Sequence, residues 1–188
     1  MATEQYTIST AFDDSQVDIA SLHGEIDEDV NITTALVGIT TASNICYIEF
    51  AAALSQAEKT ALDSIIAAHS YLNRAKSIKF GAIDDKTSAL IGAGFTFSSK
   101  QFSLSVEAQC RIIGIHQVRD DAAVTYPIKW NTKSDNDYLE LADSATVHNF
   151  YLTALGTYRA HVDSGTTLKD EVRAATTVTA VDAIVDNR

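Results

Sequence analysis

The residues best suited to chemistry form an acidic and amide cluster, Asp135-Asn136-Asp137, inside the stretch YPIKWNTKSDNDYLEL. Their side-chain oxygens are ligands of the kind that calcium prefers. An EF-hand loop needs such ligands at alternate positions, followed by a glycine and a distant glutamate, and this stretch lacks that spacing. Asp and Asn are equally typical of tight turns. We therefore predict a hairpin turn, and Asp135 and Asp137 remain the candidate ligands if a metal binds there.

The histidines do not show the spacing of a metal site. None of them forms an HxH or HExxH pattern, so only the fold could bring together His23, His69, His116, His148 and His161. We expect His69 and His161 in the last turns of apolar helices, where a hydrogen-bonding side chain suits the exposed carbonyl groups.

Two other patterns resemble catalytic or cofactor motifs only in part. Ser144 and His148 would share one helix face beside Asp143, but Asp143 or Ser144 as the cap of that helix explains the same residues. The segment Ile91-Gly-Ala-Gly-Phe95 lacks the third glycine of a dinucleotide fingerprint and precedes a strand. We predict no catalytic residue, no metal and no cofactor, and so a protein that is not an enzyme.

Aromatic side chains are concentrated in two predicted hairpins of the C-terminal half. They could stack on sugar rings, or they could fill the space between a sheet and its helices. Their alternation along strands favours the core for most of the set, which comprises Phe95, Phe97, Phe102, Tyr126, Trp130 and Tyr138. Tyr138 has polar neighbours, so we expect it to be exposed and take it as the candidate binding residue.

Composition limits the class of protein. The chain has 188 residues, 46% of them hydrophobic, and a net charge of -11. This charge argues against binding to nucleic acid or to an anionic membrane. No run approaches the roughly 20 apolar residues of a membrane span, and the N-terminus shows no signal-peptide pattern. Cys46 and Cys110 lie in apolar patterns and are expected to be buried free thiols.

The elements that would position these residues follow a repeated plan of a hairpin and then a helix. The first hairpin is predicted over residues 31–50, and the next helix begins with a capping box of Ser55 and Glu58. The second hairpin spans residues 94–104, and its helix is expected to carry Val106, Cys110 and Ile113 on one face. The third spans residues 126–141. Its helix, from about Ser144, should direct inward Val147, Tyr151, Ala154, Leu155 and Tyr158.

Short helices are predicted at both ends of this series, over residues 15–29, 167–175 and 179–185. Antiparallel hairpins interleaved with helices predict an α+β fold in two small modules. The change from basic to acidic sequence over residues 69–87 favours a boundary there. We therefore predict an N-terminal αββα module over residues 1–75 and a C-terminal α+β module over residues 76–188.

Two stretches of the C-terminal half carry a resemblance to a known family. FSLSVEAQCRIIGI and the long run from YPIKWNTKSDNDYLEL to GTTLKDEVRAA resemble a domain of unknown function in bacteriophage tail-fibre and related virion proteins. The shared features are a Phe-Ser strand entering a helix, a Trp-Asn-Thr strand before an acidic turn, and a long helix leading to Gly-Thr-Thr-Leu-Lys. The resemblance covers about Lys86 to Arg188.

The resemblance implies a structural component of a phage virion, in the tail fibre, the neck or the capsid surface. Such a protein would be made in the host bacterial cytoplasm, form a homo-oligomer and bind other virion proteins. Three alternatives remain open: a carbohydrate-binding module for attachment to host glycans, an assembly chaperone that is absent from the finished particle, and a divergent metal-dependent hydrolase.

Overall fold

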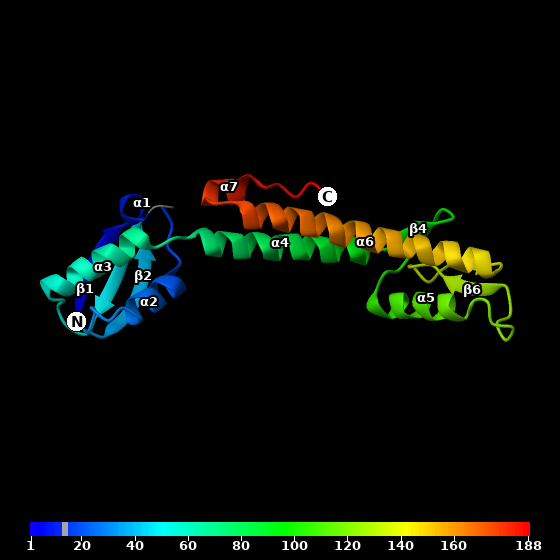
Figure 1. Ribbon diagram of the computed structural model, residues 1–188, viewed down its shortest axis with the longest axis horizontal. Coiled ribbons are helices and arrows are strands. Elements are labelled where there is room, and N and C mark those ends of the chain that lie inside the picture. The colour runs from blue at the N-terminus through cyan, green and yellow to red at the C-terminus, as the bar shows by residue number, and fades with distance from the viewer. Residues whose placement is uncertain (13–14) are drawn as a thin grey trace. The chain divides into compact units, whose positions relative to one another are not determined.

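The computed structural model describes residues 1–12 and 15–188 (Figure 1). It combines helices with small antiparallel sheets, so the predicted α+β class is confirmed. The chain divides into two compact units. Unit 1 comprises Met1–Lys79 and Ala174–Val185, and unit 2 comprises Phe80–Arg173 and Asp186–Arg188. The predicted boundary after residue 75 lies within a continuous helix, α4 (Leu72–Ala93).

Unit 1 contains a three-stranded antiparallel sheet with the order β1-β3-β2. Its strands are β1 (Ala2–Thr7), β2 (Leu36–Ala42) and β3 (Ile45–Phe50). The β2–β3 hairpin confirms the prediction for residues 31–50. Its turn residues Ser43 and Asn44 both have positive φ, 49° and 67°, which matches the right-handed twist of paired strands. The predicted αββα module missed β1.

The helices of unit 1 are α1 (Ile8–Ala11), α2 (Ile19–Asp27) and α3 (Gln56–Ala68). Helix α2 is shorter than the helix predicted over residues 15–29. The predicted capping box is present, because Ser55 Oγ accepts a hydrogen bond from Glu58 N and Glu58 Oε2 accepts one from Ser55 N. Leu22, Leu62 and Phe50 are fully buried in one core shared by these helices and the sheet.

The two cysteines differ in environment. Cys46, on β3, is fully buried, and burial raises the pKa of its thiol to about 11. The prediction of a buried thiol is therefore confirmed at Cys46. It is wrong at Cys110, which is exposed on α5 (Val106–Val118).

Helix α5 does not turn inward the face that carries Val106, Cys110 and Ile113. Val106 is 78% exposed and Ile113 is 46% exposed, whereas Ile112 is buried. The apolar residues of α5 are spread around much of its circumference, so periodicity alone did not identify the face that packs on the hairpins.

Unit 2 contains the two other predicted hairpins, each a two-stranded sheet. The first pairs β4 (Phe95–Phe97) with β5 (Lys100–Phe102), and the second pairs β6 (Ile128–Asn131) with β7 (Tyr138–Leu141). Phe95, Phe102 and Trp130 are buried, as expected for core aromatics. Their rings surround Phe150 of α6 (Ser144–Ala174). Phe150 was not among the residues that were predicted to point inward from this helix.

Gly94 joins α4 to the first hairpin of unit 2 in a way that requires glycine. Its φ is +87°, and a Cβ atom there would lie 2.0 Å from the carbonyl oxygen of Phe102. Any side chain at this position would therefore displace the β4–β5 hairpin.

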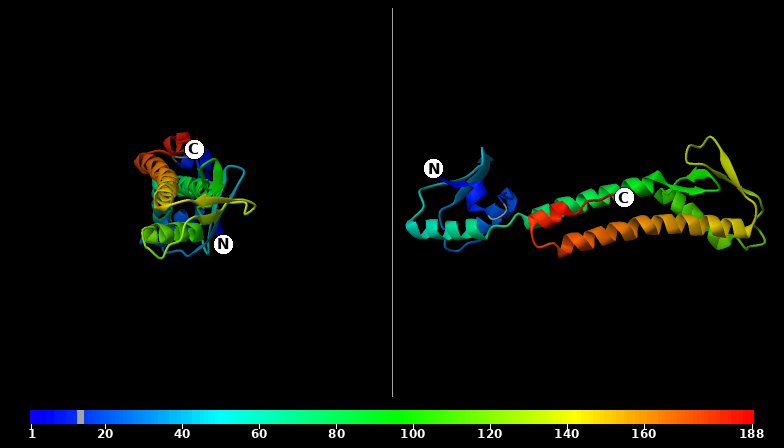
Figure 2. Two further views of the ribbon diagram at one scale, coloured as in Figure 1. Left: turned by 90° about the vertical axis from the view of Figure 1, so that its right-hand side faces the viewer. Right: turned by 90° about the horizontal axis from the view of Figure 1, so that it is seen from above.

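The C-terminal part of α4 runs antiparallel to α6 in unit 2, and Figure 2 shows this helix pair from above. The Arg173 guanidinium lies over the Phe80 ring, and Lys169 forms an ion pair with Asp84. The predicted boundary after residue 75 and the observed division between Lys79 and Phe80 both fall within α4. The prediction had also divided α6 into two helices, which was wrong, since α6 is one helix of 31 residues. No helix among residues 1–12 and 15–188 is long and apolar enough to span a membrane.

The C-terminal residues form hydrogen bonds to helices within each unit. Within unit 1, α7 (Val178–Ala183) confirms the last predicted helix, and Lys79 Nζ donates to the carbonyl oxygen of Ile184 at 3.0 Å. Within unit 2, the Arg188 guanidinium donates to Thr87 Oγ1 on α4 and to the His161 carbonyl oxygen on α6. Arg188 therefore joins α4 to α6.

Candidate functional site

The Asp135-Asn136-Asp137 cluster forms the turn between β6 and β7, as predicted. Asp135 has a φ of 59°, and its carboxylate accepts a hydrogen bond of 2.6 Å from the Asn131 side chain. Thr132 N donates to the Asp137 carbonyl oxygen at 2.8 Å and closes the loop. The acids thus serve turn geometry.

The two candidate metal ligands have separate partners. Asp137 forms an ion pair of 2.8 Å with Lys100 of β5. Hydrogen bonds from Lys100 and from the Tyr138 backbone hold the pKa of Asp137 below its usual range. Within the described part of the chain, no group of three or more His, Cys, Asp or Glu residues is arranged to hold a metal ion.

Tyr138 is 42% exposed, as expected, but its ring is not an open platform. The Lys129 ammonium group lies over that ring at 4.6 Å from the centroid. A ligand that stacked on this face of Tyr138 would first have to displace Lys129.

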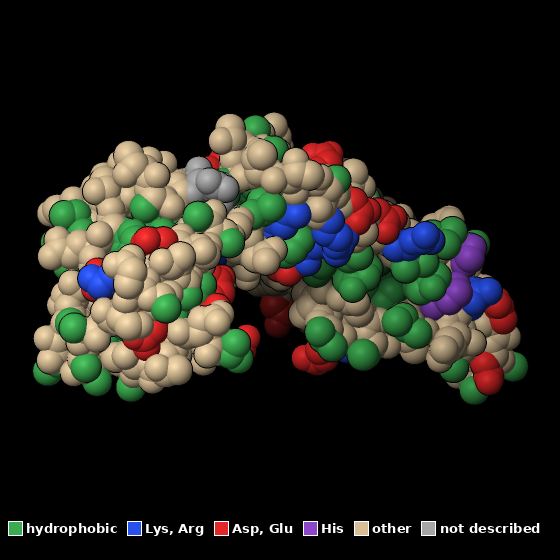
Figure 3. Space-filling model, turned by 60° about the vertical axis from the view of Figure 1, so that its left-hand side comes forward, with side chains coloured by type: hydrophobic (Ala, Val, Ile, Leu, Met, Phe, Trp, Pro, Cys, Tyr) green, Lys and Arg blue, Asp and Glu red, His purple; other side chains and the backbone are tan. Residues whose placement is uncertain are grey.

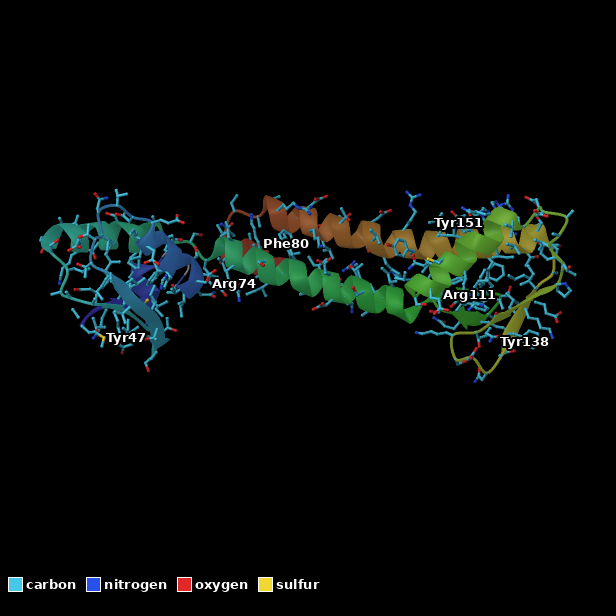
Figure 4. All side chains as sticks on the ribbon, turned by 90° about the horizontal axis from the view of Figure 1, so that it is seen from below. Tyr47, Arg74, Phe80, Arg111, Tyr138 and Tyr151 are labelled. Carbon is cyan, nitrogen blue, oxygen red and sulfur yellow. The ribbon has the colours of Figure 1, made fainter. Side chains whose placement is uncertain are left out.

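A polar depression lies beside the base of this hairpin. It has a volume of about 310 Å³ and lies between the β5–α5 loop, the first turns of α5, and the end of β6 with its turn. Arg111 extends from α5 so that its guanidinium lies 5.0 Å from the centroid of the Trp130 ring (Figure 4). Other polar side chains that line the depression are Ser103, Ser105, Glu107, Asn131 and Asp135.

Hydrogen bonds fix the two sides of this depression. Ser105 begins α5, and its Oγ accepts from Ala108 N at 3.2 Å. On the opposite side, Lys133 N donates to the Gln101 carbonyl oxygen at 2.8 Å. Lys133 Nζ donates to the carbonyl oxygens of Gly92 and Ala93 at the end of α4. The turn of the β6–β7 hairpin is therefore tied to two other elements of unit 2.

An apolar groove lies between α5 and α6, with a volume of about 220 Å³. Ile112 and Ala154 are buried at its base, while Ile113 is 46% exposed at its border. Gln109, which also lines the groove, donates from Nε2 to the Leu104 carbonyl oxygen at 2.8 Å. With this polar group occupied, the groove presents mainly hydrocarbon to solvent.

The fold brings together two of the five histidines. His116 Nε2 on α5 and His148 Nδ1 on α6 are 2.9 Å apart, and the Tyr151 ring stacks on His116 with centroids 3.9 Å apart. Burial, with Arg119 and His148 close by, lowers the pKa of His116. Spacing could not reveal this pair, because its members lie on different helices.

The remaining histidine predictions need correction. His69 caps α3, but its ring is buried and bonds to Glu25 Oε2 and Asp18 N rather than to helix carbonyl groups. His161 lies in the middle of α6 instead of at a helix end.

Ser144 donates to Asp120, and Asp143 accepts from Thr146 N at 2.7 Å as the cap of α6. Ser144, His148 and Asp143 therefore do not act as one catalytic group.

Comparison with known proteins gives one match. The family described as "Domain of unknown function (DUF4376)" matches residues 74–185, more than half of the chain. No curated protein and no solved structure matches. The matched segment holds most of α4, both hairpins of unit 2, α5, α6 and α7, and with them the polar depression, the apolar groove and the histidine pair. This chain is a member of the DUF4376 family.

Proposed function

We propose that this chain is a non-enzymatic structural component of a bacteriophage virion that assembles by binding copies of itself and other virion proteins. The virion setting comes from the resemblance of FSLSVEAQCRIIGI and of the YPIKWNTKSDNDYLEL region to tail-fibre and related proteins. The observation that carries the docking role is the apolar groove between α5 and α6.

Exposed hydrocarbon around this groove supports a docking role. Ile113 borders the groove and is 46% exposed, and Leu155 and Tyr158 of α6, which also line the groove, are partly exposed. Figure 3 shows apolar side chains reaching the surface of the molecule in several places. Large contiguous apolar patches are uncommon on monomeric proteins and commonly mark interaction sites. Covering these side chains with another protein would remove them from water and favour association.

The groove is also rigid enough to be recognised by shape. Ile112 and Ala154 at its base belong to the buried core of unit 2. Its border residues project from two helices that share this core, so little conformational entropy is lost when a partner binds. A partner of similar shape could therefore fill the groove without rearranging unit 2.

Oligomeric state tests the docking role directly. We expect light scattering after size-exclusion chromatography to give a mass above that of one 20.3 kDa chain at micromolar concentrations. Ile113→Glu and Leu155→Glu should shift the protein toward the monomer, because each places a charge in the groove. Val30→Glu is the matched control, since Val30 is 88% exposed in unit 1. A wild-type protein that stays monomeric, or variants that associate as the wild type does, would contradict the docking role.

A further inference from the structure

We propose that the polar depression beside Trp130 binds a neutral saccharide, with Arg111 and Glu107 as its principal hydrogen-bonding residues. The proposal goes beyond the docking role, because it concerns a different surface of unit 2 and a different class of ligand. It rests on the charge balance of the depression, on its unused hydrogen-bonding groups and on the rigidity of its floor.

The charges around the depression favour an uncharged ligand. Arg111 and Lys133 are opposed by Glu107 and Asp135. An anion such as phosphate would meet the two carboxylates, and a cation would meet the two basic groups. A neutral ligand meets neither repulsion, and it can still hydrogen-bond to charged partners, which form stronger bonds than neutral ones.

The unused donors and acceptors are of both kinds. Arg111 forms no hydrogen bond or ion pair with the described residues, so its guanidinium N–H groups are available as donors. The Glu107 carboxylate likewise has no partner in residues 1–12 and 15–188 and is available as an acceptor. The oxygens of Ser103 and Ser105 accept backbone N–H groups, which leaves their hydroxyl protons to donate.

This combination suits a ligand rich in hydroxyl groups. A hydroxyl group donates one hydrogen bond and accepts others, so neighbouring sugar hydroxyls can bond to a carboxylate and a guanidinium at once. Glu107 and Arg111 lie on α5 four residues apart, which places them on the same side of that helix. An apolar ligand would leave these groups without partners, at a cost of desolvation.

The floor of the depression holds Arg111 in place. Trp130 is only 8% exposed, and its ring packs against Phe150 with centroids 5.4 Å apart. The guanidinium that lies over this fixed ring is partly ordered before a ligand arrives, which reduces the entropy lost on binding. The depression, at about 310 Å³, is also at the lower end of the roughly 300–1,000 Å³ range of small-molecule sites.

Trp130 provides a specific signal for the test, because the chain contains one Trp. The full-length protein would be titrated with glucose, galactose, mannose and N-acetylglucosamine, and with sialic acid and inorganic phosphate as charged probes. Binding would be followed by Trp emission and by the indole N–H resonance in a two-dimensional NMR spectrum. We expect at least one neutral sugar, or an oligosaccharide chosen from a glycan array, to give a saturable change.

Two variants with matched controls locate the binding. Arg111→Ala and Glu107→Gln should each weaken binding about tenfold or more, which is the loss expected when a hydrogen bond to a charged group is removed. Arg159→Ala and Glu171→Gln change exposed residues of α6 outside the depression and should bind as the wild type does. The proposal fails if no neutral saccharide shifts the Trp130 signals, if only sialic acid or phosphate binds, or if both Arg111→Ala and Glu107→Gln keep wild-type affinity. The Trp130 signals of the unaltered protein decide the first two outcomes even if a variant does not fold.

Discussion

The Glu58 carboxylate shows how one residue can join three segments of unit 1. Its Oε1 accepts hydrogen bonds from the backbone and side chain of both Thr33 and Thr34, and its Oε2 accepts from Ser55 N. The bonds from Ser55, and then those from Thr34, hold the pKa of Glu58 well below its usual range. Sequence predicted the capping box but not the two threonines, since their contact depends on how the loop before β2 packs on α3.

Glu58→Gln should therefore destabilise unit 1 in a pH-dependent way. Because the pKa of Glu58 is lower in the folded state, its contribution is present above the unfolded value of about 4.3 and is lost as pH falls below it. In Gln, an NH2 group replaces one carboxylate oxygen, and this group cannot accept hydrogen bonds from backbone N–H groups. Urea unfolding should show a less stable variant at pH 7 and a smaller difference near pH 3. A difference that is the same at both pH values would contradict this prediction, and Glu28→Gln, on an exposed residue of the same unit, is the control.

The His116–His148 contact should make unit 2 sensitive to pH. The pKa of His116 is lowered in the folded state, so folding favours its neutral form. This contribution is complete above the unfolded pKa of about 6.5 and is lost as pH falls from there toward the lower folded value. Near-UV circular dichroism of Trp130 during thermal unfolding should show a falling melting temperature between pH 7 and pH 5. In His116→Gln that part of the pH dependence should be reduced, and parallel profiles of the two proteins would show that the contact has no such effect.

At the level of elements, the sequence predicted hairpins better than long helices. Alternation and turn residues marked β2–β3, β4–β5 and β6–β7, and each of these hairpins is present. A separate helix was predicted from residue 167, but α6 continues without a break through Gly165-Thr166-Thr167. The hydroxyl groups of Thr166 and Thr167 donate to the carbonyl oxygens of Val162 and Asp163, one turn earlier, so the helix satisfies them internally.

Among the candidate-site residues, roles that depend on local sequence were predicted, and contacts that depend on packing between elements were not. The turn role of Asp135 could be read from local residue types, whereas the contact of Arg111 with Trp130 depends on how α5 packs on β6. The one local sign of the polar depression was the spacing of Glu107 and Arg111 on a single helix face. The His116–His148 contact had no local sign at all.

Two glycines of α6 test how closely α4 and α6 pack. A Cβ atom at Gly165 would lie 2.7 Å from Thr87 Oγ1 and 3.0 Å from Arg188 Nη1, while one at Gly156 would have no atom within 4 Å. Gly156→Ala should stabilise unit 2 by about 0.5–1 kcal/mol through helix propensity. Gly165→Ala should destabilise it by about 1 kcal/mol, because overpacking exceeds that gain. Chemical denaturation measures both, and equal stabilisation by the two substitutions would show that the helices do not pack as closely as described.

On the scale of the whole molecule, the chain combines two units of different charge. Residues 1–73 contain eleven Asp and Glu residues and a single Lys, so nearly all of the net charge of -11 comes from this segment. Unit 2 has instead a nearly balanced charge and carries both the apolar groove and the polar depression. Repulsion between the acidic segments would oppose non-specific association, while the groove in unit 2 would favour specific docking.

The most direct test of the proposed virion role is the copy number of this chain in purified particles. Quantitative mass spectrometry of gradient-purified particles would compare the peptides of this chain with those of the major capsid protein and with host contaminants. We expect a fixed number of copies per particle that is reproducible between preparations and consistent with a symmetric oligomer. Absence of the chain, or an amount no greater than that of the host contaminants, would contradict a structural role in the virion.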